Sequence, residues 1–161
     1  MKTLNEIMTE TGSDKCEWGH NYCKYYDQHF NSLRNDSVTL LELGVGGEDK
    51  ELGGKSLLGW KEYFQKGNIY GIDIYPKQEL NQERLIVFQG SQNDFIFLHT
   101  IIDQIGSPDI IIDDASHFNS LTIESFKILF PLLRSGGLYC IEDLGCAYRH
   151  DFEGNINFND L

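Results

Sequence analysis

Basic residues are few in this sequence. Its 161 residues include 13 Lys and Arg against 25 Asp and Glu, which gives a formal net charge of -12. Because contacts with a nucleic-acid backbone need clustered Lys and Arg, this balance argues against a nucleic-acid partner. No apolar run approaches the roughly 18 residues of a membrane helix, and the start Met-Lys-Thr-Leu-Asn-Glu lacks the apolar core of a signal peptide. These absences predict a cytoplasmic protein that binds neither nucleic acid nor a membrane.

Cysteine is also sparse. The four cysteines form two pairs whose members lie seven and six positions apart, Cys16 with Cys23 and Cys140 with Cys146. These spacings match neither a Cys-x-x-Cys redox pair nor a zinc-binding pattern, so free thiols are expected. A length of 161 residues is enough for one hydrophobic core and predicts a single structural domain.

Short apolar runs alternate with helical patterns over most of the chain. This alternation predicts an α/β fold in which helices cover both faces of a mostly parallel sheet. Ser56 is a candidate N-cap for the first of these helices, and Pro131 is expected to kink or end the last one. The expected strands are Val38–Leu43, Ile69–Ile74, Leu85–Phe88, Ile110–Asp113 and Leu138–Ile141, and the expected helices are Ser56–Gln65, Phe95–Ile105 and Leu121–Leu133.

The first 35 residues differ in kind from the rest because they are rich in aromatic and polar side chains. Residues 1–35 are therefore expected to form a helical lid or flank on the ligand-binding domain of residues 36–161, within one structural domain. Packing in a helical core is the alternative interpretation of the aromatic rings.

A glycine turn follows the first expected strand. Gly44, Gly46 and Gly47 come directly after the apolar run, and Glu42 lies two positions before the first glycine. Glycines let a backbone bring its N–H groups close to a ligand, and Glu42 supplies an acceptor beside them. The third glycine of the dinucleotide fingerprint is missing, which disfavours NAD and a dehydrogenase. An ordinary turn is the alternative interpretation of the glycines alone.

A second acidic residue makes the ligand interpretation stronger. Asp73 lies near the end of the expected strand Ile69–Ile74, where an acid in a βαβ unit reaches ribose hydroxyls. The glycine turn and Asp73 together favour a nucleotide-type ligand.

Acidic residues also follow two later strands. Asp113 and Asp114 end one of them, and Glu142 and Asp143 follow another. Open α/β sheets bind ligands along this edge, and adjacent strand ends are close enough for carboxylates to share a cation. Asp114, Glu142 and Asp143 are hard oxygen ligands and are predicted to bind Mg²⁺. Asp113 is a candidate for the cofactor pocket, with a plain strand end as the alternative.

A histidine accompanies the acids. His117 lies three residues after Asp114 and is predicted to act as a general base, since histidine titrates near neutral pH. A surface loop histidine is the alternative, and His20 is a weaker candidate for the same role.

These motifs, taken in order along the chain, resemble the macrocin and mycinamicin sugar O-methyltransferases, which are class I enzymes that use S-adenosylmethionine (SAM). The Asp-Asp-x-Ser-His and Glu-Asp-Leu motifs are more specific than the glycine turn. The matching segments are Gly12–Lys15, His20, Tyr22, Leu41–Gly47, Gly54–Phe64, Tyr70–Asp73, Gln89–Gln92, Ile112–His117 and Ile141–Leu144.

The resemblance implies a Rossmann-like three-layer sandwich and Mg²⁺-dependent methylation of a sugar hydroxyl by SAM. It implies the same metal ligands and the same base that the residues themselves predict. It also implies cofactor contacts: Glu42, Gly44 and Ser56 near the methionine part, Asp73 near the ribose, Gln92 near the adenine, and Ser13 and Tyr22 in a lid. Gly46 of the glycine turn is a further candidate for cofactor binding.

Two other functions stay open. One is a SAM-dependent O-methyltransferase acting on another vicinal diol, such as a catechol, and the other is a truncated SAM-binding protein without catalysis. The resemblance implies further edge strands after Leu138–Ile141, and this sequence lacks them. An uncovered edge recruits a partner, so a homo-oligomer is expected, most simply a dimer with Cys140–Tyr148 near its interface.

Overall fold

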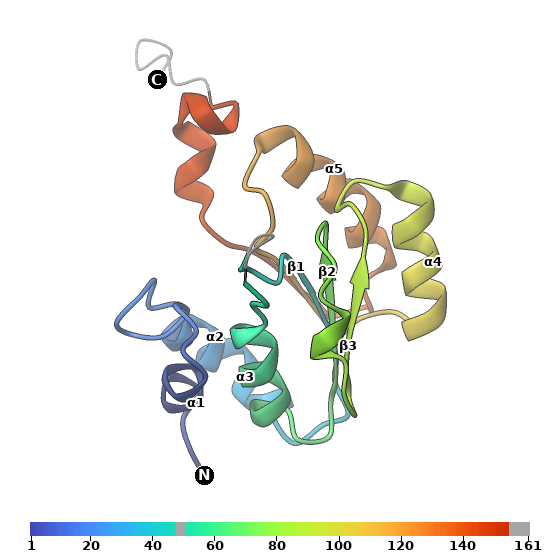
Figure 1. Ribbon diagram of the computed structural model, residues 1–161. Coiled ribbons are helices and arrows are strands. Elements are labelled where there is room, and N and C mark those ends of the chain that lie inside the picture. The colour runs from blue at the N-terminus through green and yellow to red at the C-terminus, as the bar shows by residue number, and fades with distance from the viewer. Residues whose placement is uncertain (48–50, 155–161) are drawn as a thin grey trace.

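The computed structural model describes residues 1–47 and 51–154 and contains a five-stranded parallel sheet (Figure 1). The strand order is β3-β2-β1-β4-β5, and every neighbouring pair is parallel. The expected α/β fold with a parallel sheet is confirmed. The strands are β1 (Thr39–Leu43), β2 (Asn68–Asp73), β3 (Leu85–Gln89), β4 (Ile110–Asp113) and β5 (Leu138–Ile141).

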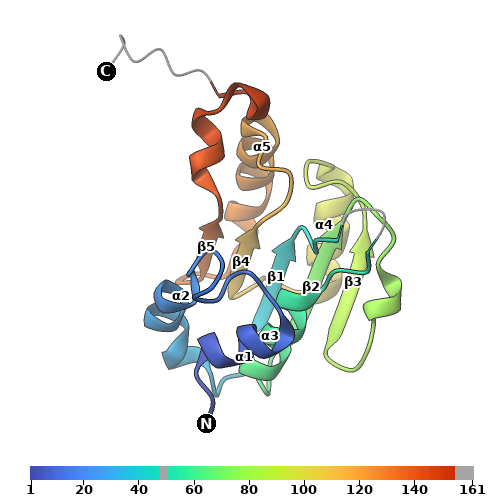
Figure 2. The same cartoon turned by 60° about the vertical axis from the view of Figure 1, so that its left-hand side comes forward.

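Helices cover both faces of the sheet, so the domain has three layers (Figures 1 and 2). The face opposite α4 and α5 carries α1, α2 and α3. The helices are α1 (Leu4–Thr11), α2 (Cys23–Phe30), α3 (Lys55–Tyr63), α4 (Phe95–Ile105) and α5 (Asn119–Leu129). Short 3-10 helices are η1 (Asn31–Leu33), η2 (Gln78–Leu80), η3 (Phe130–Leu132), η4 (Leu144–Tyr148) and η5 (His150–Phe152).

Strand β1 is buried on both faces and divides the core in two. Leu40 belongs to the apolar cluster beneath α1, α2 and α3, whereas Leu41 and Leu43 belong to the cluster beneath α4 and α5. Side chains alternate along a strand, so Glu42 points to the same face as Leu40. This alternation places the Glu42 carboxylate beneath α3.

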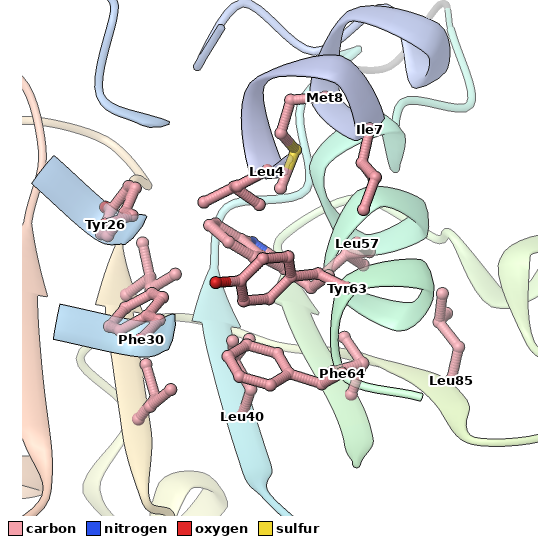
Figure 3. Packing of buried hydrophobic residues seen from close by; sticks show 14 of the residues in the cluster. Leu4, Ile7, Met8, Tyr26, Phe30, Leu40, Leu57, Tyr63, Phe64 and Leu85 are labelled. Atoms are coloured by element: carbon pink, nitrogen blue, oxygen red, sulfur yellow. The ribbon is translucent and has the colours of Figure 1, made fainter. Parts of the chain in front are cut away.

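The first 35 residues contribute directly to the core, as Figure 3 shows for α1 and α2. Leu4, Met8 and Phe30 are fully buried against α3 and the sheet. A Cβ added to Gly59 of α3 would lie 2.4 Å from the sulfur of Met8, so this glycine permits the close approach of α1. Core packing therefore accounts for much of this segment, and its treatment as a separate lid or flank stays a prediction.

Two local expectations can be compared with the structure. Helix α5 ends at Leu129, and Pro131 lies in the 3-10 turn that follows, as the sequence predicts. Ser56 is not an N-cap: that position is held by Gly54, and the Ser56 hydroxyl donates to Glu42 Oε1 at 2.9 Å. The acceptor buried beneath α3 draws the hydroxyl away from the helix end.

Three further observations bear on the predicted class. All four cysteines are free thiols, as expected. Across residues 1–47 and 51–154, no helix has the length and apolar character needed to cross a bilayer. Strand β5 is the last in the strand order and pairs with β4. The dimer expected at its outer edge stays a prediction.

Candidate active site

The carboxyl ends of four strands meet at one edge of the sheet. In the strand register Leu43 lies opposite both Ile72 and Asp113, and Asp113 lies opposite Ile141. The segments that leave these four strands are therefore neighbours. They enclose a cavity of about 540 Å³ whose lining includes Gly44, Gly46, Asp73, Gln92, Asp114, His117 and Asp143.

The first position of the glycine turn requires a glycine for steric reasons. Gly44 has φ +84°, and a Cβ there would lie 2.2 Å from the carbonyl oxygen of Asp114. Only a residue without a side chain lets the end of β1 come this close to the segment after β4. Gly46 also has a positive φ, +73°, but a Cβ there would meet nothing within 4 Å. The backbone at Gly46 thus faces open space in the cavity.

Gly44→Ala is expected to lower the free energy of unfolding by about 2–5 kcal/mol, because it adds a backbone clash to a left-handed conformation. The matched control is Gly46→Ala, which adds only the conformational cost of about 1–2 kcal/mol. Denaturant unfolding measures both. Equal losses in the two variants would contradict the close approach to Asp114.

Asp73 fixes the shape of the glycine turn. Its Oδ2 accepts a hydrogen bond from the Val45 N–H at 2.8 Å, and its Oδ1 accepts one from the Tyr75 N–H at 2.9 Å. The side chain lines the cavity, and each carboxylate oxygen has a second lone pair. Asp73 can therefore order the turn and still accept a hydrogen bond from a ligand.

Gln92 offers an unused hydrogen-bond donor. Its Oε1 accepts the Ser116 N–H at 3.1 Å, while its buried Nε2 has no partner in the described part of the chain. A buried donor without a partner costs about 1–3 kcal/mol, and a ligand in the cavity would relieve that cost. Gln92 is thus well placed for the predicted cofactor contact.

Glu42 lies behind the cavity lining, and its predicted place near the methionine part of the cofactor stays a prediction. It is fully buried, its Oε2 accepts a hydrogen bond from Trp60 Nε1 at 2.8 Å, and it is not among the residues that line either cavity described here. Burial raises the pKa of its carboxyl. Glu42 accepts a hydrogen bond from Ser56, which lines an adjoining cavity of about 270 Å³ that Ser13 also lines.

Asp113 points away from the cavity. Its Oδ2 accepts hydrogen bonds from Ser125 Oγ at 2.6 Å and Tyr139 OH at 3.4 Å, and burial raises its pKa. These contacts tie β4 to α5 and β5. Asp114, which directly follows β4, lines the cavity, and Asp113 is not among the lining residues. The predicted role of Asp113 in the cofactor pocket stays a prediction, with a plain strand end as the alternative.

Three ligand atoms suited to a cation come together at the cavity wall. One atom each from Asp114, His117 and Asp143 lies within 4.8 Å of the other two. His117 Nε2 lies 3.9 Å from Asp114 Oδ1 and 3.7 Å from Asp143 Oδ2. Both His117 and Asp143 have left-handed backbones, with φ +59° and +52°, a strain that concentrates at functional sites.

Glu142, the third predicted metal ligand, has other partners. Its Oε2 accepts a hydrogen bond from Lys15 Nζ at 2.7 Å, and its Oε1 accepts one from Tyr26 OH. Burial, followed by the charge of Asp114, raises the pKa of Glu142 to about 8. The predicted set is thus assembled in part: Asp114 and Asp143 lie together with His117, and Glu142 is held beside them by Lys15. The full ligand set stays a prediction.

Lys15 is the functional residue that the sequence reasoning did not single out. Its side chain is almost fully buried, and Nζ also donates to Asp114 Oδ2 at 2.6 Å. Burial alone would lower the pKa of its ammonium, but the carboxylates of Glu42, Asp114 and Glu142 raise it well above the usual value. The only indication in the sequence was that Lys15 belongs to Gly12–Lys15, one of the segments that carry the family resemblance.

Two more side chains from the N-terminal segment reach Asp143. Tyr22 OH donates to Asp143 Oδ1 at 2.7 Å, and burial together with this bond raises the pKa of Tyr22 to about 12. His20 Nδ1 lies 3.3 Å from the same oxygen. Tyr22, predicted to belong to a lid over the cofactor, is therefore located at the acidic cluster, and Ser13 is the predicted lid residue that lines a cavity.

Comparison with known proteins places these features among methyltransferases, although no family model matches the chain. It is 44% identical over 155 residues to mycinamicin VI 2''-O-methyltransferase of Micromonospora griseorubida and 43% identical over 155 residues to demethylmacrocin O-methyltransferase of Streptomyces fradiae. These matches cover 96% and 94% of this chain but 39% of each relative. The chain spans about two fifths of the length of the curated relatives it matches.

A solved structure gives the same result. The MycE methyltransferase from the mycinamycin biosynthetic pathway, in complex with Mg, SAH and mycinamycin VI, matches with a TM-score of 0.94 and 42% identity. The match covers 99% of this chain and 44% of that one. The predicted Rossmann-like class I fold is confirmed. Over nearly its whole length, the chain is similar to part of the macrocin and mycinamicin sugar O-methyltransferases, as its motifs predict.

Proposed function

We propose that this chain forms the cofactor-binding and catalytic part of a SAM- and Mg²⁺-dependent O-methyltransferase that acts on a sugar hydroxyl of a small glycoside. One observation carries the proposal. The lining of a single cavity includes Gly46, Asp73 and Gln92 as well as Asp114, His117 and Asp143. Candidate contacts for a nucleoside-type ligand therefore line the same cavity as an acidic group with a histidine. The similar proteins from Micromonospora griseorubida and Streptomyces fradiae are sugar O-methyltransferases, which supports the same reaction class.

The residues present fit SAM. Asp73 has acceptor capacity for ribose hydroxyls, and Gln92 Nε2 is a buried donor that lacks a partner in the described part of the chain. Ser13 and Ser56 line the adjoining cavity, which shares Gly44, Gly46 and Asp114 with the larger one. We assign the nucleoside end of SAM to the larger cavity and its methionine end to the smaller one. The acidic residues between them suit a positively charged sulfonium.

The donor set also fits a divalent cation. Asp114 and Asp143 provide carboxylate oxygens, and Glu142 is the third proposed ligand through lone pairs that Lys15 and Tyr26 leave free. When bound there, Mg²⁺ lowers the pKa of a coordinated hydroxyl and orients vicinal hydroxyls.

His117 is the proposed general base. Its left-handed backbone directs the ring into the cavity wall, where Nε2 lies within 3.9 Å of two carboxylates. A neutral ring can take the proton of a sugar hydroxyl, and the imidazolium that forms lies beside Asp114 and Asp143. A sugar hydroxyl is a weak nucleophile at neutral pH, so proton removal and positioning are the contributions required of this chain.

Asp73→Ala is expected to weaken binding of SAH, the demethylated product of SAM, by about 1.5–3 kcal/mol, because a charge-assisted hydrogen bond to ribose is lost. Calorimetry measures the affinity directly. Asp94→Ala is the matched control, since that carboxylate caps α4 at Phe97 and does not line the cavity. Unchanged SAH affinity in Asp73→Ala would rule out the ribose contact.

The reaction itself is tested by following methyl transfer from labelled SAM to macrolide glycosides, with and without Mg²⁺. We expect a methylated glycoside only when Mg²⁺ is present. Transfer to a catechol but to no glycoside would favour the alternative acceptor. SAH binding without transfer to any diol would favour a SAM-binding protein without catalysis.

A further inference from the structure

Lys15 links three strands through one ammonium group. It belongs to the segment between α1 and α2, and its side chain is 2% exposed. Nζ lies 2.6 Å from Asp114 Oδ2, 2.7 Å from Glu142 Oε2 and 3.4 Å from Glu42 Oε1. These acids come from the end of β4, the end of β5 and the interior of β1. Among the lysines and arginines of the described residues, Lys15 is the one that forms an ion pair with each of these acids.

The formal charges around this ammonium do not cancel. Glu42, Asp114 and Glu142 contact Lys15, and Asp143 lies next to Glu142 and near Asp114. Three carboxylates therefore contact one ammonium, and a fourth lies close to them. Because like charges at close range in a protein interior repel strongly, Lys15 is needed to keep Asp114 and Glu142 in place. The remaining negative charge is available to a further cation.

Lys15 and a divalent cation would use the same carboxylates. Asp114 Oδ2 and Glu142 Oε2 each accept a short hydrogen bond from Nζ, so each has less electron density to offer a metal. A cation bound by Asp114, Glu142 and Asp143 must share two of these groups with Lys15. The ammonium thus stands in for part of the cation's charge when the cation is absent.

We propose that Lys15 is a positioning residue that holds Asp114 and Glu142 in their binding arrangement in the cation-free protein and competes with the divalent cation for their oxygens. This inference rests on the proposed cation site. It predicts that the protein without Lys15 depends on the cation for stability, whereas the protein with Lys15 gains little from it.

The test is Lys15→Met, which keeps the length of the side chain and removes its charge. In EDTA the variant is expected to melt about 10 °C below the wild type, because two buried carboxylates lose their partner. Mg²⁺ is expected to raise the melting temperature of the variant by more than it raises that of the wild type, through ligand linkage. Calorimetric Mg²⁺ affinity is expected to be tighter in the variant.

Two further variants sharpen the result. Lys127→Met is the matched control, since Lys127 is exposed on α5 and has no ion pair in the described residues. Lys15→Met combined with Glu142→Gln removes one charge of each sign, and it is expected to recover at least half of the loss measured in EDTA. This double variant also serves if Lys15→Met alone fails to fold. No recovery in the double variant would overturn the inference.

The outcomes separate the inference from the proposed function. If Mg²⁺ raises the melting temperature of the wild type and of Lys15→Met equally, the role of Lys15 is overturned and the cation site stands. If Mg²⁺ shifts neither protein, the inference fails together with the cation part of the proposed function.

Discussion

His117→Ala is expected to slow methyl transfer by about 10²–10⁴-fold while leaving SAH affinity within a few-fold of the wild type. The reason is geometric. His117 lines the cavity, and its Nε2 lies close to the two carboxylates that belong to the proposed cation site. The alanine variant removes the proton acceptor without removing Asp73 or Gln92, which are assigned to the cofactor. Single-turnover rates and SAH calorimetry measure the two effects separately.

His20→Ala provides the matched comparison. His20 Nδ1 also lies close to Asp143, at 3.3 Å from Oδ1, but its side chain is 46% exposed and does not line the larger cavity. A loss below about 10-fold is expected, since an exposed ring outside the cavity is no general base. A larger loss in His20→Ala than in His117→Ala would exchange the roles of the two histidines.

Removal of the divalent cation is expected to abolish methyl transfer, and added Mg²⁺ is expected to restore it. Asp114→Asn and Asp143→Asn should each lower both Mg²⁺ affinity and turnover, by at least about 10²-fold in turnover, because a metal supplies several kcal/mol to such reactions. Titration of activity with Mg²⁺ after EDTA treatment gives the measurement.

Asp109 provides a control for the Asp114 and Asp143 variants. Asp109 directly precedes β4 at the opposite edge of the sheet, where it pairs with Arg134 at 2.8 Å. Asp109→Asn should leave the Mg²⁺ dependence unchanged. Full turnover in excess EDTA would contradict the metal role and leave Asp114 and Asp143 as strand-end acids.

The sequence was sufficient to predict the five strands, the helices between them and the end of the sheet where the candidate site lies, but not the bounds of α1 and α2. Apolar runs marked every strand, and parallel strands necessarily bring their carboxyl ends together. The sequence predicted a tight glycine turn after the first strand, and the structure shows that a side chain at Gly44 would clash with the segment after β4. The sequence also placed Asp73 near the ligand, and Asp73 lines the cavity. Such features depend on local residue order and on one general rule of sheet topology.

Side-chain direction was harder to predict, although a rule for it exists. Asp113 and Asp114 are adjacent on one strand end, so only one can face the cavity, and the same alternation places Glu42 beneath α3. Strands β1 and β4 are buried on both faces, so their apolar patterns do not show which side each acid faces. The aromatic spacing in α3 gave no warning that Ser56 and Trp60 would both donate to Glu42.

The role of Lys15 could not be read from local sequence. Its hydrogen-bond partners Asp114 and Glu142 are 99 and 127 positions away along the chain. Neither hydrophobic periodicity nor motif spacing carries information on such pairs. The same holds for Tyr22 and Asp143, which are 121 positions apart. Lys15 and Tyr22 belong to the segment between α1 and α2, and both helices pack on one face of the sheet (Figure 2).

The most direct measurement of the central claim is calorimetric titration of this chain with SAH in the presence of Mg²⁺. We predict saturable binding with one SAH per chain. We also predict a loss of affinity when Gln92, whose buried Nε2 has no partner in the described residues, is replaced by leucine. Absence of binding, or binding that Asp73→Ala and Gln92→Leu both leave unchanged, would contradict the assignment of the cavity to SAM.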